Sequence, residues 1–182
     1  MSREAQPTHH PAAKTLHWVT AVLVIGLLCL GLWMTGLPLG FTKLYAYAWH
    51  KWVGLVVLML TAARLLWRWR HPPPPLPGVV AAWEARLAPI AHWLLLGLLA
   101  VLPASGWLMS SAAGVSVYWF GYLPLPDLVP RDQDLFETLR TTHHMLARGL
   151  IVLLIVHVAA VVHHDVLRRD GVFRRMWPFG GT

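Results

Sequence analysis

Four histidines stand at the edges of long apolar runs or inside them, where an ionisable side chain is costly and is usually functional. They are His17, His50, His143 and His157. His143 and His157 are fourteen residues, or two heptads, apart. In a helix their side chains return to nearly the same face and lie about 21 Å apart along the axis, at about 1.5 Å per residue. One helical face would therefore present an imidazole near each surface of a membrane.

The other two histidines lie at matching depths. His50 begins its apolar run on the same side as His143, and His17 begins its run on the same side as His157. We therefore expect two pairs, His50 with His143 and His17 with His157. Two imidazoles suit the axial positions of haem iron, whereas zinc and similar ions take three or four ligands at one level. With no carboxylate or thiolate nearby, the pairs favour two haem groups.

Four apolar runs must position these histidines. The chain is 57% hydrophobic and only 13% charged, with a mean hydropathy of +0.53, whereas soluble domains carry about 25% charged residues. Each run is near the roughly 20 residues that a helix needs to cross a bilayer. We predict an all-α fold, a transmembrane four-helix bundle that holds two b-type haems and forms a single domain over residues 1–182. The predicted helices span about 16–34, 47–69, 89–111 and 139–163.

The formal net charge of +7 would indicate a nucleic-acid partner in a soluble protein. Here the basic residues flank the apolar runs, so the positive-inside rule explains them better and no nucleic-acid partner is expected. Ten Lys and Arg residues fall on the side of the two termini and of the loop between the second and third runs, and five fall on the other side. We therefore expect a multi-pass protein of the bacterial inner membrane, with both termini cytoplasmic.

Four cations lie near the expected pairs: Lys51 and Arg148 near the outer one, and Lys14 and Arg64 near the inner one. Each is a candidate to hold a haem propionate, or to serve only as an anchor at the membrane interface. Between the third and fourth runs, the segment Gly114–Asp134 is rich in aromatic residues and proline. We expect this segment to fold over the outer end of the bundle.

Four further residues in the runs are candidates for contacts with a cofactor. Gly26, Gly54 and Gly106 would let a macrocycle approach a helix backbone, or would equally allow close helix packing. His92, near the inner end of the third run, would line a quinone pocket, bind a haem propionate or make a polar packing contact.

Several short motifs resemble those of the bacterial cytochrome b561 family, which includes membrane superoxide oxidases. The likeness extends from about Thr15 to Pro178. The motifs are TLHW at 15–18, WHKWVG at 49–54, LPASGW at 102–107, WFG at 119–121, HVAA at 157–160 with His163 and His164 after it, and RDG at 169–171.

The resemblance implies two b haems, each held by two histidines. Carried onto this chain, the ligands are His17 with His157 and His50 with His143. His144 is a departure, because family members often have an acidic residue after the outer ligand of the last helix. Only His143 stands two heptads before His157, so we assign the outer ligand to His143.

The resemblance also implies transmembrane electron transfer. The favoured function is oxidation of periplasmic superoxide to oxygen, with reduction of ubiquinone in the lipid bilayer. Lys43, Lys51 and Arg148 would then form a basic funnel, with Lys51 and Arg148 as the catalytic cations, because positive charge steers an anion to the outer haem. The acidic residues Asp127, Asp132 and Asp134 of the outer loop argue against a wholly positive mouth.

Two alternatives remain open. The first is a non-catalytic cytochrome subunit that relays electrons between the quinone pool and a periplasmic redox protein docked on the outer loop. The second is a haem-free metal transporter or scaffold.

Overall fold

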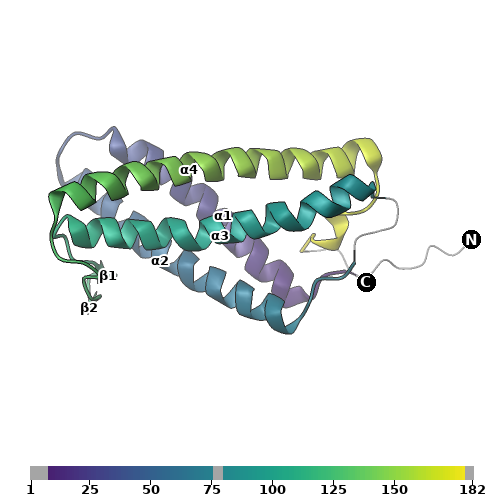
Figure 1. The fold of residues 1–182 in the computed structure, drawn as a ribbon, viewed down its shortest axis with the longest axis horizontal. Coiled ribbons are helices and arrows are strands. Elements are labelled where there is room, and N and C mark those ends of the chain that lie inside the picture. Colours follow the sequence, from purple (N-terminus) through teal and green to yellow (C-terminus); the bar gives the residue numbers. More distant parts are fainter. Residues whose placement is uncertain (1–7, 76–79, 179–182) are drawn as a thin grey trace, which may run out of the picture.

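The computed structural model describes residues 8–75 and 80–178 and consists of four long helices with a small hairpin (Figure 1). All four helices are long and apolar enough to cross a membrane, so the predicted transmembrane four-helix bundle is confirmed. The elements are α1 (Pro11–Thr35), α2 (Phe41–Arg70), α3 (Ala82–Ala112), β1 (Tyr118–Trp119), β2 (Leu123–Pro124), α4 (Gln133–Val162), the π-helical η1 (His163–Arg168) and the 3-10 helix η2 (Phe173–Arg175).

Helices α1, α2 and α3 each extend past both ends of the apolar run that predicted them. Helix α4 begins earlier than predicted and continues as η1. α2, α3 and α4 each begin six or seven residues earlier than the runs predict. These added turns extend past the apolar runs and are stabilised locally. The side chain of Asp132, for example, accepts a hydrogen bond of 2.9 Å from the backbone N–H of Leu135 and so caps α4. In α4, therefore, hydrophobicity marks the part of the helix that crosses the membrane core, and the cap at Asp132 marks where the helix begins.

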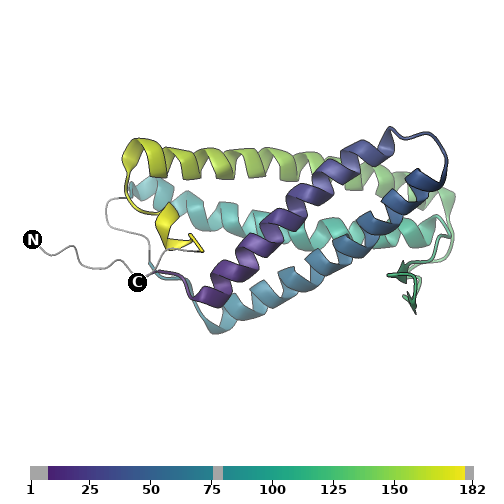
Figure 2. The ribbon, with the colours of Figure 1, turned by 180° about the vertical axis from the view of Figure 1, so that it is seen from behind.

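The helices pack as two pairs. α1 packs against α2 and α3 against α4, and the contact between α2 and α3 joins the pairs. In Figures 1 and 2, α3 and α4 run side by side while α1 crosses obliquely. Backbone contacts of α4 with α1 and α2 are few, and a cavity lined by residues of all three helices lies between them. We refer to the end where α1 begins and α4 ends as the inner end, and to the opposite end as the outer end.

Residues one heptad apart form three layers through the bundle. Val24, Val57, Leu99 and Leu150, one from each helix, form the buried apolar core. Because a heptad returns a side chain to nearly the same helix face, this core layer also orients the residues seven positions away. The inner layer is His17, Arg64, His92 and His157, and the outer layer is Gly31, His50, Gly106 and His143.

The hairpin does not fold over the outer end as predicted. It lies beside α2, level with the outer ends of the helices, in both views of the bundle (Figures 1 and 2). Two indole contacts hold it there: Trp52 Nε1 donates to the carbonyl of Tyr118 at 2.6 Å, and Trp119 Nε1 donates to the carbonyl of Trp52 at 3.3 Å.

The C-terminal segment closes the inner end of the bundle. The indole N–H of Trp18 donates to the carbonyl of Met176 at 2.8 Å, and the buried Arg175 donates to the carbonyl of Pro75 at 2.8 Å. The imidazole of His164 hydrogen-bonds to the carboxylate of Asp170 at 2.5 Å. This segment, drawn in yellow in Figure 2, therefore connects α4 to α1 and to the loop between α2 and α3.

We expect this closure to loosen in acid. Although burial would raise it, hydrogen bonds from His164 and from the backbone N–H of Val172 hold the pKa of the Asp170 carboxyl below its ordinary value. A carboxyl with a lowered folded pKa stabilises the fold above its unfolded pKa of about 3.9, and this contribution disappears as the pH falls through the folded pKa. Hydrogen exchange of amides 170–177, corrected for intrinsic rates, should accelerate below about pH 4.

Asp170→Asn should show fast exchange already at neutral pH. Asp165→Asn, which changes an exposed carboxyl nearby, is the matched control and should behave like the parent protein. Exchange at 170–177 that is equally slow in parent and Asp170→Asn would contradict the prediction.

Candidate functional site

His50 of α2 and His143 of α4 face each other at the outer end, with their ring centroids 6.4 Å apart. Bonds from imidazole nitrogen to a metal such as zinc are about 2.0–2.1 Å, so two of them, with roughly 1.1 Å from each nitrogen to its ring centre, span about 6.3 Å. The spacing therefore suits two imidazoles that bind opposite sides of one metal ion.

His17 of α1 and His157 of α4 face each other in the same way at the inner end, again with ring centroids 6.4 Å apart. The imidazole of His92 lies 5.6 Å from that of His157, and the guanidinium of Arg64 lies 3.3 Å from Nδ1 of His17. The structure thus brings both predicted pairs together and adds the two predicted neighbours to the inner one.

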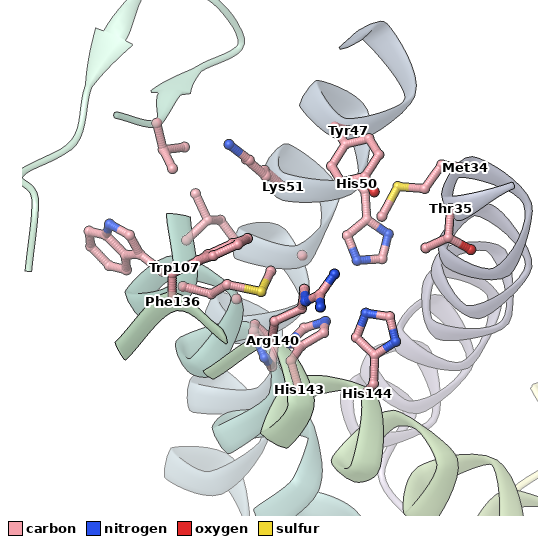
Figure 3. A pocket seen from close by; sticks show the side chains of 16 residues that line it. Met34, Thr35, Tyr47, His50, Lys51, Trp107, Phe136, Arg140, His143 and His144 are labelled. Atoms are coloured by element: carbon pink, nitrogen blue, oxygen red, sulfur yellow. The ribbon is translucent and has the colours of Figure 1, made fainter. Parts of the chain in front are cut away.

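Two cavities adjoin the outer pair, with volumes of about 250 and 310 Å³. Both are lined by His50, Gly54 and His143, and Figure 3 shows these histidines converging on the first cavity from α2 and α4. One cavity extends toward Lys51 and the outer loop, and the other extends toward the apolar core. Pockets for organic cofactors are mostly apolar and hold about 300–1,000 Å³, so the space suits a flat macrocycle.

A lone metal ion fits this arrangement less well. In the part of the chain that the structure describes, no group of three or more His, Cys, Asp or Glu side chains is arranged to hold a metal ion. Each level instead offers two opposed imidazoles across the space between the helix pairs, which is the ligand set of a six-coordinate haem.

Glycines make room for the outer imidazoles. A Cβ atom at Gly106 would lie 3.2 Å from Cε1 of His143, and one at Gly31 would lie 3.2 Å from Cε1 of His50. A Cβ at Gly54 would meet nothing within 4 Å, because Gly54 borders open cavity. Gly106 therefore accommodates a histidine ring, whereas Gly54 leaves space for a bound group. Gly31 was not predicted, although it stands two heptads after His17 on the same helix.

Ser105 holds the ring of His143 in one orientation. Its buried hydroxyl donates to the carbonyl of Leu102 at 2.7 Å and lies 2.9 Å from Nδ1 of His143. Because the hydroxyl proton is already used, the serine oxygen accepts from the Nδ1–H of His143, which leaves Nε2 free to bind a metal. The sequence analysis did not single out Ser105, although it directly precedes Gly106. By contrast, Nδ1 of His50 is buried without a hydrogen-bond partner among the described residues.

Cations surround the outer pair. The ammonium of Lys51 donates to the hydroxyl of Ser110 at 2.7 Å, and Lys51 and Arg140 line the cavity nearer the outer loop (Figure 3). Arg148 lines the cavity nearer the core. Arg140 was missed by the sequence analysis, yet it stands three residues before His143, the spacing of neighbours on one helix face. His144 also lines both cavities.

The structure combines a four-helix membrane bundle with an opposed pair of imidazoles near each end. This combination is typical of the class of membrane haem cytochromes. The profile of one such family, prokaryotic cytochrome b561, matches residues 8–179. The chain belongs to the prokaryotic cytochrome b561 family. It is therefore a multi-pass inner-membrane protein of electron transfer, for which the family implies b-type haem.

Individual relatives match about 90% of the chain. Cytochrome b561 homolog 2 of Escherichia coli (strain K12) is 31% identical over 174 residues, which cover 90% of this chain and 88% of the relative. The probable superoxide oxidase CybB of Yersinia pestis is 30% identical over 168 residues, covering 90% and 92%. Cytochrome b561 homolog 1 of Escherichia coli (strain K12) is 25% identical over 165 residues, covering 90% and 93%.

Replacing Gly106 should weaken haem binding at the outer end. The new methyl group of Gly106→Ala would press on Cε1 of His143, whose ring cannot turn away without losing Ser105. Gly97→Ala, on the same helix with nothing within 4 Å of the new Cβ, is the matched control. Alanine favours a helix over glycine by about 0.5–1 kcal/mol, so the control should be folded and haem-replete. The measurement is haem per chain after purification, and equal haem in both variants would refute this reading of Gly106.

Proposed function

We propose that the chain holds two b haems and carries electrons from periplasmic superoxide to ubiquinone. The observation that carries the proposal is the equal spacing of 6.4 Å in two histidine pairs, one near each end of α4. Haem supplies a one-electron carrier, which no ordinary side chain provides. Two carriers with ligands about 21 Å apart along α4, and with macrocycle edges closer than that, would connect the two membrane surfaces.

In this proposal each residue has a defined task. His50 and His143 bind the outer haem, and His17 and His157 bind the inner one. Gly54 and Gly106 leave room for the outer macrocycle and its ligand. Arg64 and His92 contact the inner cofactor, and His92 is also the proposed contact to quinone.

Lys51 and Arg148 act on superoxide in this scheme. Two superoxide ions each lose one electron and become oxygen, and one ubiquinone takes up the two electrons with two protons and becomes ubiquinol. Lys51 lines the cavity on the side of the outer loop, where its charge would attract an anion. Likeness to a probable superoxide oxidase, at 30% identity, also supports this substrate.

The contacts of the ligands differ between the two levels, which supports inward electron flow. His143 donates its Nδ1–H to Ser105, which makes the ligand more electron-rich and stabilises ferric iron. At the inner level the guanidinium of Arg64, 3.3 Å from His17, places positive charge beside the ligand and favours ferrous iron. The inner haem should therefore have the higher midpoint potential.

The direction relative to the cell follows from charge. Ten of the fifteen Lys and Arg residues belong to the inner end, which we assign to the cytoplasm with both termini. The alternative function is a relay between the quinone pool and a periplasmic redox protein, and it needs the same two haems but no reaction with superoxide.

Mixing quinone-loaded protein in vesicles with a superoxide source separates these functions. The enzyme should show rapid haem reduction and ubiquinol formation, and His50→Ala should abolish both. Lys51→Met should slow haem reduction by about tenfold or more at low salt, since electrostatic steering contributes 10–10³ in rate. Lys51→Arg is the matched control, because it keeps the positive charge at the same position and should retain most of the parent rate. No haem reduction by superoxide, with reduction by ubiquinol intact, would favour the relay.

The potentials of the two haems provide a second test. The parent protein should contain two haems per chain, with two resolved midpoint potentials. Arg64→Gln should lower only the higher potential, and Ser105→Ala should raise only the lower one. Arg64→Lys keeps the charge and should retain most of the parent value. If both variants move the same potential, the assignment of these residues to separate haems is wrong, and a single haem per chain would refute the two-haem proposal itself.

A further inference from the structure

The segment 114–126, which contains the hairpin, presents an uncharged aromatic surface. Its thirteen residues include no Asp, Glu, Lys or Arg, and four of the five residues 118–122 are aromatic. Tyr122 is 90% exposed and Tyr118 is 56% exposed. An exposed apolar patch of this kind marks a surface that binds something other than water.

The hairpin is held rigidly to α2. Besides the two indole hydrogen bonds of Trp52 and Trp119, the ring of Phe120 packs 5.3 Å from Trp52 and 6.1 Å from Trp49, between ring centroids. Phe120 has a φ of +49°, a left-handed conformation that is unfavourable for a bulky residue and persists only where surrounding contacts impose it. The exposure of the hairpin tip is therefore a built feature of the fold.

The position of the hairpin indicates its partner. Figures 1 and 2 place it beside α2 and level with the outer ends of the helices, rather than beyond them. The neighbouring turns of α2 expose Leu44, Tyr45 and Trp49. The headgroup region of the extracytoplasmic leaflet would cover these side chains. Tyrosine and tryptophan are enriched at that depth, because their rings are amphipathic. A polar protein partner would instead call for charges, and the first charged side chain of the loop is Asp127.

We propose that the hairpin tip, residues 118–123, is inserted into the lipid headgroup region of the extracytoplasmic leaflet. This inference concerns a surface and does not depend on which electron donor the protein uses. The insertion would also fix one wall of the outer cavity, because Val117 of the same segment is buried and lines it. In addition, the carbonyl of Val115 accepts from Ser110 at 2.6 Å, and Ser110 is the partner of Lys51.

Site-directed spin labelling can measure the depth of the tip. Cys29 is the only cysteine of the chain, so Cys29→Ser gives a background without thiols. Tyr122→Cys and Leu123→Cys place a nitroxide at two exposed positions of the tip, and Asp127→Cys is the matched control in the same loop. Each variant is reconstituted with haem into phosphatidylcholine vesicles, and its haem content must equal that of the background. The readout is collision of the label with oxygen, which concentrates in lipid, and with a water-soluble nickel chelate.

Labels at 122 and 123 should collide several-fold more with oxygen relative to the chelate than the label at 127 does. Equal exposure of all three labels to the chelate would overturn the proposal and indicate a tip in water. Protection from the chelate together with dipolar broadening between labels would also overturn it, because a second copy of the chain would then be covering the tip.

Discussion

One constraint organises the whole bundle, namely that each helix must present the same face to its neighbours at three depths. Val24, Val57, Leu99 and Leu150 form an apolar layer at the centre, and the residues seven positions on either side carry the chemistry. Packing at the centre therefore decides which side chains meet at the ends. A shift of α4 by a single residue would rotate its face by about 100° and would part both histidine pairs at once, because α4 carries one member of each pair.

The inner layer and the outer layer meet this constraint differently. At the outer level each histidine passes a glycine of the adjacent helix, Gly31 beside His50 and Gly106 beside His143. At the inner level each histidine instead meets a polar side chain of the adjacent helix, Arg64 beside His17 and His92 beside His157. The outer imidazoles are thus placed by the absence of side chains, and the inner ones lie among polar groups. Two histidine pairs of like spacing thus have unlike surroundings, which is the property that the proposed directional electron path would require.

The sequence was most informative about features that repeat regularly over many residues, such as hydrophobic runs and heptad spacing. Hydrophobic runs predicted four membrane helices, and the two-heptad spacing of His143 and His157 predicted which residues would meet. Both follow from helix geometry and from the cost of burying polar groups in lipid. The true starts of α2, α3 and α4 were missed, because their first turns lie outside the apolar runs and depend on local caps such as Asp132.

Features that depend on contacts between helices were not predictable in the same way. Ser105 is one of several small polar residues in α3, and only the distance to His143 distinguishes it. Gly106 was predicted to admit a macrocycle or to allow close helix packing. Its contact with the imidazole of His143 was not foreseen, because the rotation of α3 against α4 is not encoded in either helix alone. The hairpin was misplaced for a related reason: its position is decided by Trp49 and Trp52, which a reading along the chain assigns only to α2.

At each end of the bundle a segment that does not span the membrane packs against the helices: the C-terminal segment closes the inner end, and the hairpin lies beside the outer end. The C-terminal segment binds Trp18 next to His17, and the hairpin binds Trp52 two residues after His50. Each segment therefore attaches to a tryptophan adjacent or nearly adjacent to a histidine of the inner or outer pair. A low local dielectric strengthens the effect of a single nearby charge or hydrogen bond. The difference between Arg64 at one level and Ser105 at the other would carry little weight in an open, hydrated site, so its effect depends on how well the surrounding chain keeps water from each histidine pair.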